Sequence, residues 1–237
     1  NHGYKSLLYL EKYGYDETKY MYPCSGTVIE DAIGVIFHSK FSSNEAKKYY
    51  EVDAEHIVMI PLVKTTDQIT DKVEIRKLLG IKEKILLICS FGMMTTAKLS
   101  HRLINAFLSS NLLMQSNAQL IFVGENPGDE YVREIMNLIK NNNLDKRITI
   151  TGYVNHEQFK RYQQASDIAV QLRTKSRGET SKAVLDVLSF GIPTIINANG
   201  SMAEYPNDIL IKLDDEFTDE ELIKALNILC DDGALRE

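Results

Sequence analysis

Short apolar runs alternate with amphipathic stretches along most of this chain. The runs are continuous rather than interleaved with polar residues, which is typical of strands buried on both faces of a sheet. The stretches between them carry apolar residues at helical spacing. The predicted strands are residues 85–91, 119–123, 148–151, 168–172, 194–197 and 209–213, and the predicted helices are residues 73–79, 98–109, 130–141, 156–165, 180–190 and 219–229. This alternation predicts an α/β fold with a doubly wound parallel sheet.

The beginning of the chain has a different pattern. Its first 30 residues are rich in tyrosine and only weakly periodic. Behind them, two apolar runs at residues 32–38 and 57–61 flank a helical stretch at residues 41–50, with Ser39 or Ser42 as the N-cap. This part is too short for a complete sheet of its own, and it predicts a piece of a further domain.

A polar stretch near residues 65–70 separates the two patterns and predicts a domain boundary. We therefore expect residues 1–64 to be a remnant of an amino-terminal domain with its linker. Residues 65–237 are expected to form a ligand-binding α/β domain. The chain starts with Asn1 instead of methionine, which favours a piece of a longer protein.

Composition and charge exclude several classes of protein. The 237 residues carry a formal net charge of −6, which is unfavourable for general binding to a nucleic-acid backbone. No apolar run approaches the roughly 18–20 residues that span a bilayer, and no signal-peptide pattern is present.

The three cysteines, Cys24, Cys89 and Cys230, are far apart and predict reduced thiols in the cytoplasm. The five histidines lack metal-ligand spacing, so no metal site is expected.

Ligands of such sheets bind outside the carboxyl ends of the strands, which selects the loops at residues 91–98, 124–129, 152–156, 173–181 and 197–204. In the first loop, Gly92 permits close approach of the backbone to a ligand. Lys98 is expected to open the following helix, where free N–H groups favour anions. The pair predicts a phosphate site, and an ordinary turn with a solvated lysine is the alternative.

The fourth loop is richer in groups that bind anions. Three cations, Arg173, Lys175 and Arg177, follow a buried strand and precede a helix. Gly178 adds backbone freedom, and Thr180 and Ser181 are expected to place hydroxyls at the first helical turn. This combination can hold an anion.

Two carboxylates follow the cations. Glu179 and Asp186 are expected to share one helix face, roughly 10 Å apart along the axis. That spacing suits two acceptors on two hydroxyl-bearing parts of one extended ligand. In the alternative interpretation, Glu179 only favours the helix N-terminus and Asp186 is solvated. The fifth loop, residues 197–204, is either a turn or a backbone cradle for a sugar or phosphate.

Several segments together resemble the carboxyl-terminal half of family-four retaining glycosyltransferases, which consist of two facing Rossmann-like domains (the GT-B architecture). The segments are GVIFHS at 34–39, HIVMIPL at 56–62, SFG at 90–92, FVGE at 122–125, TGY at 151–153, ASD at 165–167 and FGIP at 190–193. The stretch from Leu172 to Ser181, with its Gly-Glu-Thr-Ser segment, is similar to bacterial polysaccharide glycosyltransferases.

The resemblance implies roles for matching positions. Lys98 would contact the donor diphosphate, Glu179 the donor sugar and Asp186 the nucleoside ribose. The backbone of residues 178–181 would support the phosphates. The nucleobase would lie beside Gly152, Tyr153 and Val154.

The chain also departs from the family pattern. The family has two glutamates eight residues apart; here the first place holds Gly178, with Glu179 one residue later, and the second place holds Asp186. Met93 replaces the arginine of the first loop. We hypothesise that Arg173 or Arg177 supplies the missing positive charge.

The expected activity is transfer of a sugar, with retention, from a GDP- or UDP-sugar to a glycan or lipid-linked acceptor in surface polysaccharide biosynthesis. Lys98 and Glu179 are the expected catalytic residues, with no metal and no cofactor. The missing amino-terminal domain would be a partner. The full protein is expected in the cytoplasm, with peripheral association at the inner face of the membrane. A non-catalytic sugar-nucleotide-binding module and a nucleotide-sugar epimerase remain as alternatives.

Overall fold

The computed structural model describes residues 28–29, 31–50, 54–64, 69–176 and 178–236. The tyrosine-rich start, Cys24 and Arg177 lie outside these ranges. The described chain divides into two compact units. The first contains the chain up to Val63 together with Lys175–Thr180, and the second contains Lys64–Thr174 and Ser181–Glu237.

The first unit contains a small strand–helix–strand motif. Strands β1 (Val35–Phe37) and β2 (Ile57–Met59) pair in parallel around α4 (Lys40–Tyr49), and a 3-10 turn (Ala54–His56) leads into β2. Ser39 is the N-cap, because its side chain accepts a hydrogen bond from the Ser42 amide at 3.1 Å. Both predicted strands are present but shorter than expected.

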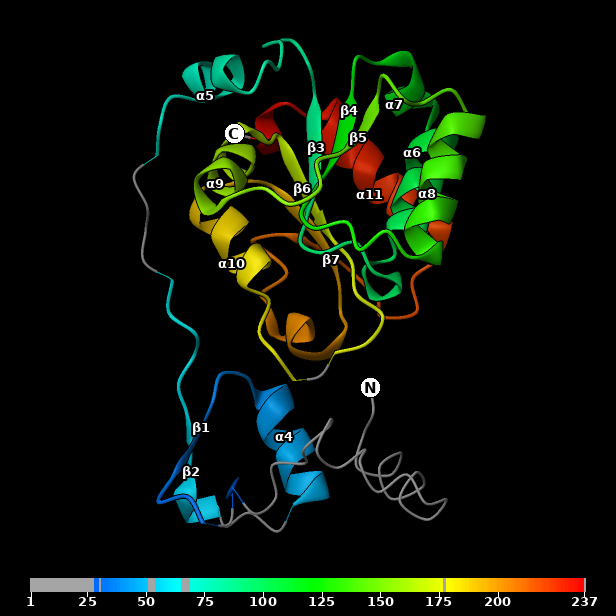
Figure 1. Ribbon diagram of the computed structural model, residues 1–237. Coiled ribbons are helices and arrows are strands. Elements are labelled where there is room, and N and C mark those ends of the chain that lie inside the picture. The colour runs from blue at the N-terminus through cyan, green and yellow to red at the C-terminus, as the bar shows by residue number, and fades with distance from the viewer. Residues whose placement is uncertain (1–27, 30, 51–53, 65–68, 177, 237) are drawn as a thin grey trace. The chain divides into compact units, whose positions relative to one another are not determined.

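The second unit is built on a six-stranded, fully parallel sheet with the order β5-β4-β3-β6-β7-β8 (Figure 1). The strands are β3 (Leu87–Phe91), β4 (Gln119–Val123), β5 (Ile148–Ile150), β6 (Ile168–Gln171), β7 (Thr194–Asn197) and β8 (Ile211–Leu213). This is the strand order of Rossmann-type sheets, in which the chain reverses direction across the sheet at one point. The reversal lies between β3 and β6, which pair through Ile88 with Ile168 and Cys89 with Ala169.

Helices cover both faces of this sheet (Figure 1). One layer contains α6 (Ser100–Ser109), α7 (Asn111–Gln115), α8 (Glu130–Asn141) and α11 (Asp219–Asp231). The other contains α5 (Lys72–Leu78), α9 (His156–Ala165) and α10 (Lys182–Ser189). The predicted doubly wound parallel sheet is therefore confirmed.

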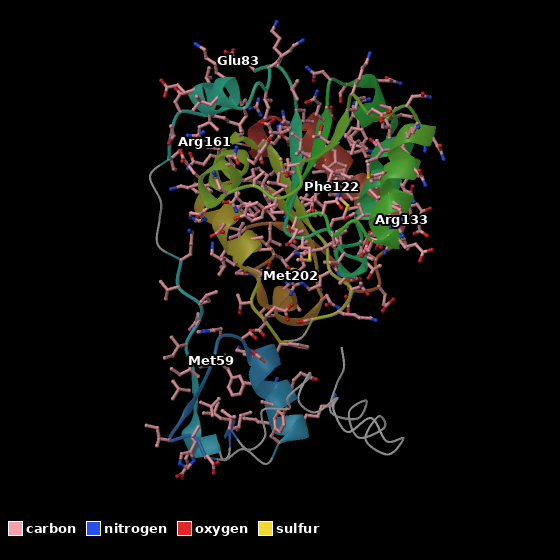
Figure 2. All side chains as sticks on the ribbon, in the orientation of Figure 1. Met59, Glu83, Phe122, Arg133, Arg161 and Met202 are labelled. Atoms are coloured by element: carbon pink, nitrogen blue, oxygen red, sulfur yellow. The ribbon has the colours of Figure 1, made fainter. Side chains whose placement is uncertain are left out.

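The sheet core explains the continuous apolar runs. Every residue of β3, β6 and β7 is buried, and so are four of the five residues of β4. Figure 2 shows Phe122 of β4 in the interior and Arg133 and Glu83 at the periphery. Burial on both faces requires apolar side chains in both directions, which removes the alternation that a half-exposed strand would show.

An ion pair between buried Arg76 and partly buried Asp167 joins the two strands at the reversal. Asp167, directly before β6, accepts hydrogen bonds from the Leu87 amide at 2.7 Å and from Arg76 Nη2 at 2.5 Å. Arg76 is 5% exposed and also donates to the carbonyl oxygens of Glu83, Ile85 and Ala165. One guanidinium thus connects α5 to the amino-terminal ends of β3 and β6.

Replacement of Arg76 tests this connection. Arg76→Ala should lower the free energy of unfolding by about 3 kcal/mol, since it leaves buried carbonyls without donors and a carboxylate without its closest cation. Lys72→Ala is the matched control, because Lys72 pairs with the same carboxylate at 2.7 Å but its side chain is 42% exposed. Urea unfolding measures both. Equal losses for the two variants would contradict the assignment.

Candidate functional site

Three neighbouring strands of the second unit end at glycines with positive φ. Gly92 follows β3 with φ +112°, Gly124 follows β4 with φ +149°, and Gly152 lies after β5 with φ +69°. Gly124 and Gly152 form an antiparallel bridge, and Thr151 Oγ1 accepts from the Gly124 amide at 3.2 Å. We call Gly92, Gly124 and Gly152 the glycine ledge. It exposes backbone without side chains at the carboxyl-terminal ends of β3, β4 and β5.

The ledge is closely packed. A Cβ on Gly124 would lie 2.4 Å from the carbonyl oxygen of Gly92, so no other residue fits without movement of the backbone. The Gly92 amide donates to the Val123 carbonyl at 2.9 Å, and the Met94 amide donates to the Glu125 carbonyl at 3.0 Å. The first two loops are thereby held together.

Lys98 extends back toward this ledge. A Cβ on Gly92 would lie 3.5 Å from both Cε and Nζ of Lys98. The predicted position of Lys98 at the start of a helix is wrong: it ends a 3-10 turn (Thr96–Lys98), and α6 begins at Ser100. Leu99 separates them, because its left-handed backbone, φ 53°, interrupts the helical path. The cation is near the ledge, but it does not lie in the first turn of α6.

The loop after β6 is attached to the loops after β3 and β7. The Thr174 amide donates to the Ala97 carbonyl at 3.0 Å. Asn197, which is fully buried, accepts from the Arg173 amide at 2.8 Å and donates to the Arg173 carbonyl at 2.7 Å. Its amide group also donates to Asp215 at 3.1 Å. Asn197 therefore sets the backbone from which the Arg173 side chain projects.

The remaining predicted site residues lie in several places. Tyr153 is 80% exposed, whereas Val154 packs against the core on the α5–α9–α10 side of the sheet. Ser181 is the N-cap of α10, without a side-chain capping bond. Thr180 precedes the cap, so the hydroxyls do not lie in the first helical turn as predicted.

Glu179 and Asp186 do not share a helix face. Glu179 is exposed and belongs to the first unit with Gly178, while α10 begins only at Lys182. The prediction assumed that the helix starts at residue 180. The positive φ of Gly178, +95°, and the bond from its amide to Ser176 Oγ at 3.1 Å indicate a turn instead.

Asp186 is buried, so the solvated alternative is wrong. Its Oδ2 atom accepts from Lys182 Nζ at 2.7 Å and from Gln163 Nε2 at 3.5 Å, and Oδ1 lies 3.2 Å from Lys64 Nζ. Burial alone would raise the pKa of Asp186, but the hydrogen bonds and charges of Lys182 and Lys64 outweigh it and place the pKa below its ordinary value. The carboxylate is an ionised acceptor at neutral pH.

Other features of the described residues bear on cofactors and membranes. They contain no group of three or more His, Cys, Asp or Glu side chains that could hold a metal ion. No helix in the described ranges is long and apolar enough to cross a membrane.

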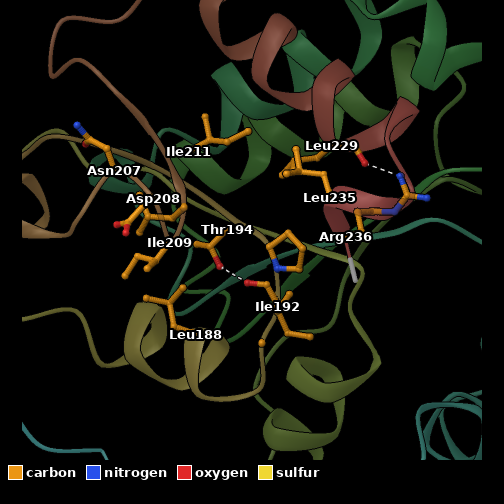
Figure 3. A pocket seen from close by; sticks show the side chains of 13 residues that line it. Leu188, Ile192, Thr194, Asn207, Asp208, Ile209, Ile211, Leu229, Leu235 and Arg236 are labelled. Atoms are coloured by element: carbon orange, nitrogen blue, oxygen red, sulfur yellow. Dashed lines mark hydrogen bonds between the residues drawn. The ribbon is translucent and has the colours of Figure 1, made fainter.

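A pocket of about 560 Å³ opens at the amino-terminal ends of the strands, opposite the glycine ledge (Figure 3). It lies before β7 and β8, where Ile192, Ile209, Leu229 and Leu235 form much of its wall. None of its lining residues is a predicted site residue. The pocket is therefore separate from the glycine ledge.

A family model described as glycosyl transferases group 1 matches residues 71–237. The chain belongs to this family. No curated protein matches it in sequence. The matched residues contain the whole six-stranded sheet and the glycine ledge.

Solved structures of other glycosyltransferases are similar. WaaG, a glycosyltransferase involved in lipopolysaccharide biosynthesis, has a TM-score of 0.73 and 21% identity, over 85% of this chain and 54% of that one. Anabaena HepE in complex with UDP has a TM-score of 0.76 and 18% identity, over 88% of this chain and 57% of that one. Its complexes with UDP and glucose and with UDP-glucose are similar as well. Sucrose-phosphate synthase from Thermosynechococcus elongatus has a TM-score of 0.76 and 19% identity, over 93% of this chain and 54% of that one.

These identities establish a shared fold. They confirm the predicted Rossmann-like α/β sheet of glycosyltransferases with GT-B architecture. The chain spans about half the length of these proteins. Sequence reasoning named Gly92 and Gly152 as site residues. It selected the loops that begin at Gly124 and Asn197 without singling out these two residues, and it did not consider Lys64. A glycine directly after a buried strand was the available signal for Gly124.

The close approach at Gly124 generates a prediction for the candidate site. Gly124→Ala should destabilise the protein by about 2 kcal/mol more than Gly128→Ala, because both substitutions strain a positive φ but only the first forces two backbones apart. A Cβ on Gly128, with φ +67°, would meet nothing within 4 Å. Thermal and chemical unfolding measure the difference. Similar losses would show that the ledge tolerates a side chain.

The Asn197 contacts generate a further prediction for this site. Asn197→Ala should lower the free energy of unfolding by about 2 kcal/mol and speed hydrogen exchange at the Arg173 amide, since the amide and the carbonyl of Arg173 both lose the Asn197 side chain as their partner. Asn199→Ala is the control, because Asn199 donates to the same Asp215 carboxylate as Asn197 does, at 2.9 Å. Unchanged exchange at Arg173 in Asn197→Ala would contradict this.

Proposed function

We propose that this chain is the carboxyl-terminal, donor-binding part of a retaining glycosyltransferase. It would take a hexose from a UDP- or GDP-sugar for transfer to a glycan or lipid-linked acceptor in surface polysaccharide biosynthesis. The glycine ledge with Lys98 beside it is the observation that carries the proposal. The UDP bound to the structurally similar HepE supports a uridine nucleotide as the first candidate.

The ledge is suited to a diphosphate. Phosphate oxygens can approach a backbone without side chains closely, and the Lys98 ammonium supplies positive charge beside Gly92. Arg173 would add a second charge from the loop after β6, which Asn197 holds in place. We assign Arg177 a similar role from the sequence alone.

Charge develops on the diphosphate as the bond between sugar and phosphate breaks. Cations aimed at the leaving group stabilise that transition state, and the reaction in this proposal proceeds without a metal ion. Lys98 would act in this way. Glu179 would contact the donor sugar, and the backbone of residues 178–181 would support the phosphates.

The nucleoside would occupy the remaining positions. Asp186 is an ionised acceptor, which suits the ribose hydroxyls as donors. The nucleobase would lie beside Gly152, Tyr153 and Val154; the exposed Tyr153 ring offers an apolar face for stacking. The acceptor would bind to a further, amino-terminal domain of a longer protein, which we place in the cytoplasm at the inner face of the membrane.

Nucleotide binding to Lys98 variants tests the proposal. UDP should raise the unfolding midpoint of the wild-type chain, because a ligand that binds the folded state stabilises it. Lys98→Ala should weaken UDP binding about tenfold, as expected for loss of one charged contact, yet leave uridine binding unchanged. GDP and UDP-glucose in the same thermal-shift series compare the donors.

The control is Lys140→Ala, an exposed lysine near the end of α8. It should bind UDP as the wild type does. Absence of a shift with every UDP and GDP compound would overturn the donor-site proposal. Equal loss of uridine and UDP affinity in Lys98→Ala would remove Lys98 from the phosphate site.

A further inference from the structure

Cationic and amide groups from two parts of the chain contact the two oxygens of the Asp186 carboxylate. Lys182 lies one turn earlier on the same helix and holds Oδ2 together with Gln163 of α9. Lys64 holds the other oxygen, at 3.2 Å, from the residue at which the chain enters the second unit. The Asp186 side chain is only 6% exposed.

The two lysines differ in their surroundings. The Lys182 side chain is 67% exposed, and a pair of this spacing on one helix contributes little. The Lys64 side chain is 22% exposed and faces Oδ1, an oxygen shielded from solvent that accepts no hydrogen bond of good geometry. An ammonium at this distance therefore satisfies Oδ1 by charge, with a weaker contact than the one at Oδ2.

A nucleotide would compete for this oxygen. In the proposed function, on which this inference rests, Asp186 accepts hydrogen bonds from ribose hydroxyls. Hydroxyls and an ammonium are both donors, and Oδ1 has almost no exposed surface through which a second donor could approach beside Lys64. A ribose hydroxyl can reach Oδ1 only if the Lys64 ammonium moves aside.

We propose that Lys64 is an affinity-determining residue of the donor site, which occupies Asp186 in the empty protein and gives way to ribose when a nucleotide binds. Its release frees the start of the second unit from α10. Donor binding then has two effects of opposite sign on local order. It stabilises the loops around the ligand, and it loosens the chain around Lys64.

The charges around Asp186 support this arrangement. The groups that face it are Lys182 from its own helix, the neutral Gln163 from α9 and Lys64 from the entering segment. The cations hold its pKa below the ordinary value despite burial. The empty site therefore keeps an ionised acceptor, and a ligand does not have to remove a proton from it.

The experiment compares the wild-type chain with Lys64→Met, and UDP is the probe. Lys64→Met keeps an apolar stem of similar length and removes the competing ammonium. We expect UDP to bind the variant about three- to fivefold more tightly at neutral pH, the range of one partly exposed ion pair. Calorimetric titration measures the Kd.

Hydrogen–deuterium exchange gives the signature that a structural role alone would not produce. In the wild type, UDP should speed exchange in a peptide that contains residues 58–64. Lys64→Met should exchange fast there without UDP and show no further change. Lys64→Arg should restore the wild-type response, and Lys182→Met, the matched control on α10, should retain it.

A titration without ligand tests the ion pair itself. In Lys64→Met the pKa of Asp186 should rise, since burial remains and one cation is lost. A carboxylate with a depressed folded-state pKa stabilises the protein above its unfolded-state pKa, and this stabilisation disappears as the pH falls through the folded-state pKa. The variant should therefore lose it at higher pH. The carboxyl ¹³C shift of Asp186 reports the pKa.

The outcomes separate this inference from the proposed function. If the wild type binds UDP, but Lys64→Met binds it equally or more weakly and exchange at residues 58–64 does not respond, the inference is overturned and the function stands. Unchanged UDP binding by Asp186→Asn would overturn it as well. If no UDP or GDP compound binds the wild type, both fall, even where the Asp186 titration confirms the ion pair.

Discussion

The ion pair of Arg76 and Asp167 is the interaction on which the second unit depends. Asp167 accepts from the first amide of β3 and stands directly before β6, so one carboxylate spans the seam at which the strand order reverses. Arg76 adds five hydrogen bonds from α5 around the same point. A charge removed from solvent is stable only when its polar atoms are satisfied. Here the carbonyl oxygens of Ala165, at the end of α9, and of Glu83 and Ile85, in the loop before β3, accept from the buried guanidinium.

The seam and the candidate site occupy opposite ends of the same strands. At the amino ends, charge and hydrogen bonds hold β3 against β6. At the carboxyl ends, the chain continues into loops that the Thr174 amide and the Asn197 side chain connect by hydrogen bonds. The glycine ledge stands beside them, where the absence of side chains leaves backbone for a ligand to approach. Rigid strands whose following loops are held by hydrogen bonds preorganise a binding site.

Most of the fold could be predicted from the sequence. The bounds predicted for β4, β7, α8 and α9 agree with the structure, because continuous apolar runs and clear helix caps mark them. The short helix α7 was missed; it has five residues and adds little periodicity. The start of α10 was placed too early, since the sequence does not show where the turn at Gly178 ends. That error created the false helix face shared by Glu179 and Asp186.

The candidate site was predicted only in part. Gly92, Lys98, Arg173 and Asp186 carry visible chemistry next to predicted strands or within a predicted helix, so sequence reasoning could select them. Their roles remain predictions, and the partners of Asp186 were not foreseen. Lys64 is one lysine among many in the sequence. Only the folded chain shows that it reaches a carboxylate more than a hundred residues away.

The sequence by itself therefore determined the type and order of the elements and the chemical inventory of the loops. These depend on local periodicity, on caps and on the placement of glycines, all of which act over a few residues. Tertiary structure decided the contacts: the approach of Gly92 and Gly124, the hold of Asn197 on Arg173, and the ion pair of Lys64 with Asp186. Such contacts join residues that are distant in the chain, and their distances are set by the packing of the whole sheet with its helices.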